Sequence, residues 1–241
     1  MVVYSPNPDD SFSRMSADNI RRVIDVWADQ YVELGSRDEI NYVQIFENRG
    51  SMMGASNPHP HCQVWANERV PTLPQKKSWH QKEYSQFRGR VMLLDYLAIE
   101  LDKRDRIVFE SDHFVTLVPF WAVWPFETMI LPRRHRVSVA DLDDDERLDL
   151  ADCLRRITAR YDNMFKSDFP YSMGVVQKPT DGQDHGWWQM YVGFTPPLLR
   201  SATVRKFMVG YELFAMAQRD ITPEQAAERL RELPDTRFDQ A

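Results

Sequence analysis

The sequence predicts an α+β fold made of two similar halves, in which helices pack against antiparallel sheet. The first observation behind this prediction is the order of patterns: a helical period is followed by strand-like runs, and the same order then returns. The second is that no Gly/Ser-rich linker or low-complexity tract interrupts the chain. We therefore expect one compact unit with a boundary near residues 101–106, which separates a half 1–101 from a half 102–241.

The first half is expected to begin with an amphipathic helix. Ser16 is a residue type that caps helices, apolar residues recur after it at helical spacing, and Gly35 is placed to end the helix. Residues 42–48 and 61–65 are typical of strands, and the region around Gly54 connects them. The expected unit is a helix followed by a β-hairpin.

The second half repeats helices and strands. A helix over residues 82–101 leads into it, and the acidic run 141–146 suits the start of another helix, where negative charge is favourable. A closing pair of helices ends the chain, the last one beginning at Thr222-Pro223-Glu224-Gln225. The predicted strands of this half are residues 106–110, 114–120, 127–131, 171–176 and 187–194.

Composition argues against several classes of protein. The chain has 241 residues, 43% of them hydrophobic and 27% charged, which is enough apolar material for a substantial core. A net charge of −6 without a basic run argues against nucleic acid or an anionic membrane as the main partner. No apolar stretch approaches the length of a membrane span, and no signal-peptide pattern follows Met1. The two cysteines, Cys62 and Cys153, lie far apart in the sequence, which fits a reducing compartment better than a disulfide scaffold. We therefore expect a cytoplasmic protein.

The strongest functional signal is a segment with two histidines and a glutamine at alternate positions. In an extended strand His59, His61 and Gln63 share one face, because successive side chains point to opposite faces. Pro58 and Pro60 fix their own φ angles and restrict the residues before them, which stiffens the approach to His61. This face is a candidate active site, although a histidine on a strand is more often structural.

Imidazole in this setting suits nucleophilic attack on phosphorus. When a backbone carbonyl holds one ring nitrogen as a donor, the other keeps a lone pair that can attack and form a phosphoramidate. Gln63 adds an uncharged amide donor for a phosphate oxygen on which negative charge develops. Because an amide is not a general acid, it favours transfer to a second substrate over hydrolysis. We predict His61 and Gln63 as the catalytic residues.

Several motifs in order along the chain resemble galactose-1-phosphate uridylyltransferases of class I, in the histidine-triad superfamily. They cover nearly the whole sequence and are specific. The motifs are Phe46-Glu47-Asn48-Arg49-Gly50, Met53-Gly54-Ala55-Ser56, His59-Pro60-His61-Cys62-Gln63 and residues 117–121, 131–135, 169–174 and 196–212.

The resemblance implies a histidine-triad-like fold and, in galactose metabolism, a ping-pong transfer of UMP from UDP-glucose to galactose 1-phosphate through a uridylyl-histidine intermediate. His61 falls on the family's nucleophile and Gln63 on its phosphate-binding glutamine. Family members are homodimers whose active sites use both subunits, so Gln218 is expected to serve the partner's site. The positions that match contacts to the nucleotide sugar are Asn48, Gly54, Ala55, Ser56, Gln63, Lys206, Phe207, Tyr211, Glu212 and Gln218.

Two departures from the family pattern change what is expected. The family carries a long segment before the residues that match here, including much of the uridine pocket, so the chain is expected to be an N-terminally shortened relative with an incomplete first half. The family also has a metal site in its second half. Its ligand positions are occupied here by Lys77, Val176, Tyr191 and Gly193, none of them a useful ligand, so that site is expected to be lost.

A zinc ion is weakly supported. His59 matches a zinc ligand of some relatives, but a structural zinc site usually needs four Cys or His ligands, and the chain has two cysteines and no Cys-x-x-Cys pair. A packing or orienting role for His59 is therefore favoured over a metal role. Attack by imidazole needs no Lewis acid, so no cofactor is expected to be required for the chemistry.

Two other functions stay open at this point. A catalytically impaired isoform or paralogue that serves as a dimer partner fits the shortened N-terminus and the lost metal ligands. A nucleotide hydrolase or phosphorylase of the same superfamily is a weaker alternative, because Gln63 stands where a third histidine would favour hydrolysis. Trp121, Trp124, Trp187 and Trp188 are candidates to stack on a uracil, but aromatic residues at strand spacing more often belong to the core.

Overall fold

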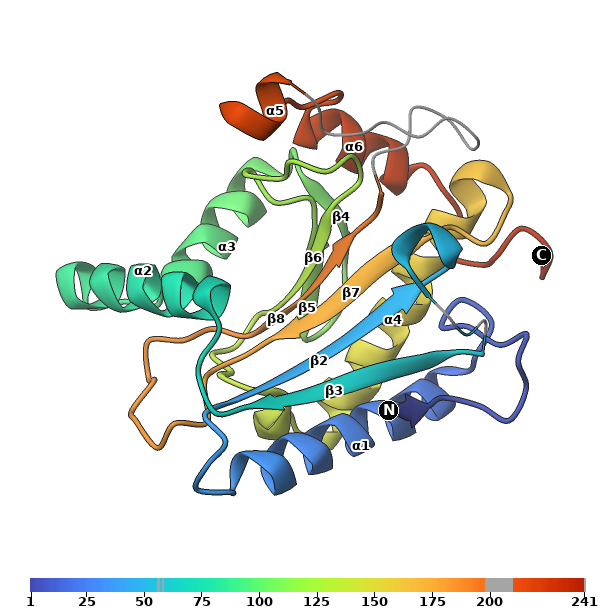
Figure 1. Ribbon diagram of the computed structural model, residues 1–241. Coiled ribbons are helices and arrows are strands. Elements are labelled where there is room, and N and C mark those ends of the chain that lie inside the picture. Colours follow the sequence, from blue (N-terminus) through green and yellow to red (C-terminus); the bar gives the residue numbers. More distant parts are fainter. Residues whose placement is uncertain (56, 58, 198–209, 241) are drawn as a thin grey trace.

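The computed structural model describes residues 1–55, 57, 59–197 and 210–240 (Figure 1). Within these residues, an eight-stranded antiparallel sheet has the strand order β1-β3-β2-β7-β8-β6-β5-β4, and helices pack on it, which confirms the predicted α+β class. The strands are β1 (Val2–Val3), β2 (Tyr42–Arg49), β3 (His61–Asn67), β4 (Ile107–Glu110), β5 (Phe114–Leu117), β6 (Thr128–Pro132), β7 (Tyr171–Val176) and β8 (Tyr191–Thr195). The α-helices are α1 (Ala17–Gly35), α2 (Thr72–Arg88), α3 (Met92–Lys103), α4 (Asp144–Phe165), α5 (Tyr211–Phe214) and α6 (Pro223–Arg231), and short 3-10 helices span Ser51–Met53 and Val139–Asp141.

The same local unit occurs twice in the chain. Helix α1 is followed by the antiparallel pair β2–β3, and helix α4 is followed by the antiparallel pair β7–β8. Strands β2 and β7 also pair with each other, so the sheet continues without a break from one unit to the next. The division of the chain into two similar halves at residues 101–102 stays a prediction.

The three helix starts predicted from capping residues and acidic charge are confirmed. The side chain of Ser16 accepts a hydrogen bond from the backbone N–H of Asn19 and caps α1. Helix α4 begins with a capping box between Asp143 and Glu146, and α6 begins with one between Thr222 and Gln225. These caps use short-range hydrogen bonds, which is why the sequence alone predicts them.

The single helix predicted over residues 82–101 is wrong. Two helices, α2 and α3, meet at Gly89, which has a φ of 66° and ends α2 by donating its N–H to the carbonyl of Ser85. Glycine adopts this left-handed conformation without steric cost, so the helical period stops there and restarts after Val91. The strand predicted from residue 187 is also shorter, because β8 begins only at Tyr191.

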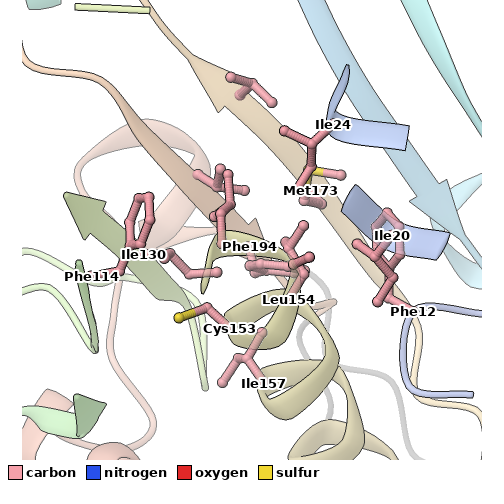
Figure 2. Packing of buried hydrophobic residues seen from close by; sticks show 14 of the residues in the cluster. Phe12, Ile20, Ile24, Phe114, Ile130, Cys153, Leu154, Ile157, Met173 and Phe194 are labelled. Carbon is pink, nitrogen blue, oxygen red and sulfur yellow. The ribbon is translucent and has the colours of Figure 1, made fainter. Parts of the chain in front are cut away.

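The main core lies between one face of the sheet and helices α1 and α4. Figure 2 shows side chains of both helices packed with strand side chains on this face, among them Ile20, Ile24, Leu154, Met173 and Phe194. These side chains are nearly inaccessible to solvent, and burying each contributes about 1.5–3 kcal/mol. The two long helices therefore hold β2, β3, β7 and β8 in place.

The other face of the sheet is covered at its β4 end. Leu93 and Leu97 of α3 pack there with Leu131 of β6 in a second, smaller cluster. This face continues across β7 and β2 to β3, near the opposite edge of the sheet. Among the described residues, no helix is long and apolar enough to cross a membrane.

Both cysteines are buried free thiols, and we expect them to be unreactive in the folded protein. Burial raises the pKa of Cys62 above its usual range and raises the pKa of Cys153 to about 12. The thiolate is the reactive form, so a colorimetric disulfide reagent should label neither thiol of the native protein at about pH 8 and both in urea. Rapid reaction of one thiol before unfolding would contradict this arrangement.

Candidate active site

Strand β3 places the predicted catalytic residues on one face of the sheet. Cys62 points to the core, where the indole N–H of Trp27 on α1 donates to its sulfur over 3.2 Å. Since side chains alternate along a strand, His61 and Gln63 point to the opposite face, away from α1. The local apolar pattern thus aims both polar side chains at the face that α1 does not cover.

The ring of His61 has the hydrogen bond that a nucleophilic imidazole needs. Its Nδ1 lies 2.7 Å from the carbonyl oxygen of His59, which can only accept. Nδ1 therefore carries the proton in the neutral ring, and the lone pair lies on Nε2. His59, whose carbonyl accepts this bond, lies in a bend two residues before His61, and Pro60 separates the two.

His59 does not continue the strand, which corrects the expectation that it shares an extended segment with His61 and Gln63. β3 starts at His61, the backbone N–H of His59 meets the side chain of Asn57, and the ring Nε2 of His59 lies 2.6 Å from the carbonyl oxygen of Ser5. That nitrogen acts as the donor, so in the neutral ring of His59 the lone pair lies on Nδ1. In the described part of the chain, no group of three or more His, Cys, Asp or Glu residues is placed to hold an ion.

Gln63 is held by its neighbour on the same face. The indole nitrogen of Trp65 donates to Oε1 of Gln63 over 3.1 Å. Because the oxygen of the Gln63 amide accepts this hydrogen bond, the NH₂ group of the amide points away from Trp65. Gln63 can therefore act as the uncharged hydrogen-bond donor that the proposed chemistry requires.

Asn48 lies on the same face as Gln63. Phe46 of β2 pairs with Gln63, and Asn48 is two residues further along β2. The hydroxyl of Ser172 on β7 donates to Oδ1 of Asn48 over 2.7 Å. This contact orients the second amide in the same way that Trp65 orients Gln63.

A cavity of about 610 Å³ opens beside His61. Among its lining residues are three of the predicted site positions, Asn48, Ala55 and His61, together with His59. Gln63 and Gly54 are not among the residues that line it. Arg49, Arg14 and Asp168 contribute charge to the wall, so the cavity is polar and large enough for part of a nucleotide sugar.

The turn around Gly54 is closed by its own backbone hydrogen bonds. Gly54 has a φ of 78° and ends the short 3-10 helix, and its N–H donates to the carbonyl of Ser51. The N–H of Ala55 donates to the carbonyl of Gly50. In this conformation the two N–H groups stabilise their own turn, and Ser56 lies outside the described residues.

Helix α5, which carries two of the predicted substrate-binding residues, does not reach His61 within this chain. Tyr211 and Glu212 belong to α5, and Figure 1 shows α5 well separated from the start of β3. Gln218 is exposed and follows α5 in the chain. Lys206 and Phe207 lie outside the described residues.

The positions expected to have lost the family's metal form a different contact. Nζ of Lys77 donates to the hydroxyl of Tyr191 over 2.8 Å and lies 5.2 Å from the centroid of that ring. Val176 pairs with Tyr191 in the sheet, and all of them line a cavity of about 280 Å³ together with Gly193. The side-chain amine of Lys77 thus lies among the four positions that match the family's metal ligands.

Glu47 is a buried carboxyl group beside the candidate site that the sequence motif did not single out. It is 5% exposed, lines the same cavity as His61, and faces the hydroxyls of Tyr4 at 3.3 Å and Tyr171 at 3.5 Å. Burial raises the pKa of Glu47 from 4.5 to about 7, against the opposing effect of Arg49. Nothing in the spacing of the sequence distinguishes this glutamate from an ordinary strand residue.

The raised pKa of Glu47 predicts a pH-dependent loss of stability. Between about pH 4.5 and pH 7 the unfolded chain has released this proton while the folded protein keeps it, so the free energy of unfolding falls as the pH rises through that window, by at most about 3 kcal/mol. Glu47→Gln lacks this term. Urea unfolding at about pH 5 and pH 8 should therefore show the variant gaining on the wild type at the higher pH, whereas a constant difference would argue against the shift.

Two domain models of one protein family match almost the whole chain. The N-terminal domain model of galactose-1-phosphate uridyl transferase matches residues 1–71, and the C-terminal domain model matches residues 77–241. Galactose-1-phosphate uridylyltransferase of Haemophilus influenzae is 48% identical over 99% of this chain, and that of Rattus norvegicus is 49% identical over 99%. The chain spans 68% and 63% of the lengths of these two relatives.

Solved structures agree on the fold. A uridylyltransferase mutant superimposes with a TM-score of 0.87 at 26% identity, covering 95% of this chain and 73% of the other. An ADP-glucose phosphorylase from Arabidopsis thaliana, at 24% identity, has the same fold with a TM-score of 0.84 over 96% of this chain and 72% of its own.

The fold and the strand with His61 and Gln63 define an α+β protein with an antiparallel sheet and a candidate active site at the start of one strand. Within that class, the chain belongs to the galactose-1-phosphate uridylyltransferase family.

Proposed function

We propose that the protein transfers UMP from UDP-glucose to galactose 1-phosphate, with His61 as the nucleophile. The observation that supports this most directly is the contact between Nδ1 of His61 and the carbonyl of His59, in a chain of this family. It leaves the Nε2 lone pair available for attack. The names of the relatives supply the substrate class, which the geometry alone does not distinguish.

The reaction has two balanced steps. Nε2 of His61 attacks the α-phosphorus of UDP-glucose, a P–N bond forms, and the bond from phosphorus to the bridging oxygen breaks to release glucose 1-phosphate. A phosphate oxygen of galactose 1-phosphate then attacks the same phosphorus, and the P–N bond breaks to give UDP-galactose. The imidazole is neutral before and after the cycle. The reaction therefore needs no proton donor at the position of Gln63, where an amide cannot supply one.

Amide groups near His61 fit the charge that develops on phosphorus. We assign the NH₂ group of Gln63 to a non-bridging phosphate oxygen, where a donor stabilises the transition state more than the substrate. We assign Asn48, oriented by Ser172, to a neighbouring oxygen or hydroxyl of the substrate. Gly54, Ala55 and the remaining positions inferred from the family complete the proposed substrate contacts.

We further propose a homodimer in which Tyr211, Glu212 and Gln218 of one subunit serve the site at His61 of the other. The separation of α5, which carries Tyr211 and Glu212, from the start of β3 within one chain supports this arrangement. Sedimentation analysis should give a dimer under assay conditions. Two buried free thiols suit a reducing compartment, and we propose the cytoplasm.

The test is a labelling experiment on the wild-type protein. Incubation with UDP-glucose labelled in the uracil ring should leave acid-labile label on the protein, and peptide mapping should place it on His61. Adding galactose 1-phosphate should discharge the label as UDP-galactose. An unlabelled protein at saturating UDP-glucose would defeat the proposal, and release of free UMP without an acceptor would indicate a hydrolase instead.

A further inference from the structure

We propose that Trp65 is a positioning residue that sets which end of the Gln63 side-chain amide faces the substrate phosphate. The inference rests on the proposed function, in which Gln63 donates a hydrogen bond to that phosphate. Both residues belong to β3 and are two positions apart, so their side chains leave the same face of the sheet. The indole nitrogen of Trp65 lies 3.1 Å from Oε1 of Gln63.

The chemistry of the two groups allows only one orientation of the amide. An indole N–H is a donor and has no acceptor atom, whereas a carboxamide has an oxygen acceptor at one end and two N–H donors at the other. The oxygen of Gln63 must therefore face Trp65, and the NH₂ group faces away from it. With no donor at position 65, the amide can turn its oxygen toward the phosphate, where it repels the developing negative charge.

The indole itself is held in place by a neighbouring strand. Its ring meets the ring of Phe46 on β2 edge to face, with centroids 5.5 Å apart and an interplanar angle of 77°. Phe46 is also the residue that pairs with Gln63 across the two strands. Trp65 is nevertheless 58% exposed, so its ring contributes little to the core, and its hydrogen bond to Gln63 is the contact that its polar atom makes.

A base-stacking role for Trp65 makes a different prediction. A stacking platform depends on the ring and not on the N–H group. Trp65→Phe keeps an aromatic ring that can still pack on Phe46, but it removes the donor to Gln63. Trp65→Ala removes both, so the two variants separate the roles.

The test measures turnover of UDP-glucose by Trp65→Phe. We expect kcat, and the rate of glucose 1-phosphate release in the first turnover, to fall about five- to tenfold while KM changes by less than about twofold, because the amide then spends most of its time in unproductive orientations. Trp79→Phe is the matched control, since Trp79 is also 58% exposed but lies on α2. It should keep the wild-type rate.

A double-mutant cycle tells positioning from a general structural effect. In a Gln63→Ala background there is no amide to orient, so adding Trp65→Phe should cause no further loss. An equal loss in both backgrounds would overturn the inference. So would a wild-type rate for Trp65→Phe combined with a loss in Trp65→Ala, which would assign the ring to stacking.

A second measurement needs no turnover and separates this inference from the proposed function. In protein with ¹⁵N-labelled tryptophan, the indole proton of Trp65 should exchange with solvent more slowly than that of Trp79, and Gln63→Ala should abolish the difference. Equal exchange of the two protons in the wild type would disprove the hydrogen bond. A protein that shows slow exchange at Trp65 but takes no label from UDP-glucose would keep the contact and refute only the activity.

Discussion

Replacing His61 with asparagine is expected to abolish the covalent intermediate and lower turnover by at least about a thousandfold. Asparagine fills similar space and can still donate to the carbonyl of His59, but it has no lone pair on nitrogen that attacks phosphorus. The measurement is uridylyl transfer to galactose 1-phosphate, together with the amount of acid-labile label on the protein.

The fold should tolerate this change. His61 lies at the start of β3 and is partly exposed, so its replacement removes little buried surface, and the free energy of unfolding should change by less than about 1 kcal/mol. His80→Asn, at an exposed histidine on α2, is the control and should retain full activity. Substantial label on the His61→Asn protein would show that another residue is the nucleophile.

Replacing Asp162 with asparagine is expected to have the largest effect on stability. Asp162 is completely buried on α4, and its carboxylate accepts hydrogen bonds from Arg49 at 2.8 Å, from Arg237 at 2.9 Å and from the hydroxyl of Ser13 at 2.6 Å. Both arginine side chains are themselves nearly buried. The neutral amide would leave two guanidinium groups under-compensated, at a cost of about 3–5 kcal/mol.

Chemical denaturation measures this loss directly. Asp152→Asn on the same helix is the matched control, because its pairs with arginine are partly exposed and worth less than about 1 kcal/mol. If Asp162→Asn does not fold, Ser13→Ala removes one hydrogen bond of the same network and should cost about 1 kcal/mol. A loss at Asp162 no larger than at Asp152 would mean that water screens the network.

The Asp162 network also supports the candidate site. Arg49 is the last residue of β2 and directly follows Asn48, and Arg237 belongs to the C-terminal segment. One carboxylate on α4 therefore joins the end of β2 to residues almost two hundred positions away in the chain. We expect Asp162→Asn to lower activity as well, through the position of Asn48.

Local features of the site were predictable because their causes are local. The alternation of His61, Cys62 and Gln63 assigns two polar side chains to one face and one apolar side chain to the core, and the structure has that arrangement. The capping residues at Ser16 and Thr222 likewise act within one helical turn. At Gly89 two local signals compete, because the helical period of apolar residues continues while the glycine favours a helix end. The helical period alone predicts one helix there, and the structure has two.

Other parts of the site depend on contacts that the sequence does not mark. Ser172 orients Asn48 across 124 positions of the chain, and the hydroxyls of Tyr4 and Tyr171, both distant from Glu47 in the sequence, lie against its buried carboxyl group. Trp65 differs, since its place two residues after Gln63 was visible in the same alternation. The donor role of its indole depends on the orientation of the Gln63 amide, which exists only in the folded strand.

By itself, the sequence determined the α+β class, the strand that carries His61 and Gln63, and membership of a uridylyltransferase family. Hydrophobic periods, helix caps and motifs each depend on residues that are close together in the chain, so the sequence alone reveals them. Tertiary structure alone decided that β2 pairs with β7, that Asp162 joins Arg49 to Arg237, and that α5 lies far from His61. Strand pairing and buried ion pairs bring together groups that are distant in the chain, and their energies depend on burial that exists only after folding.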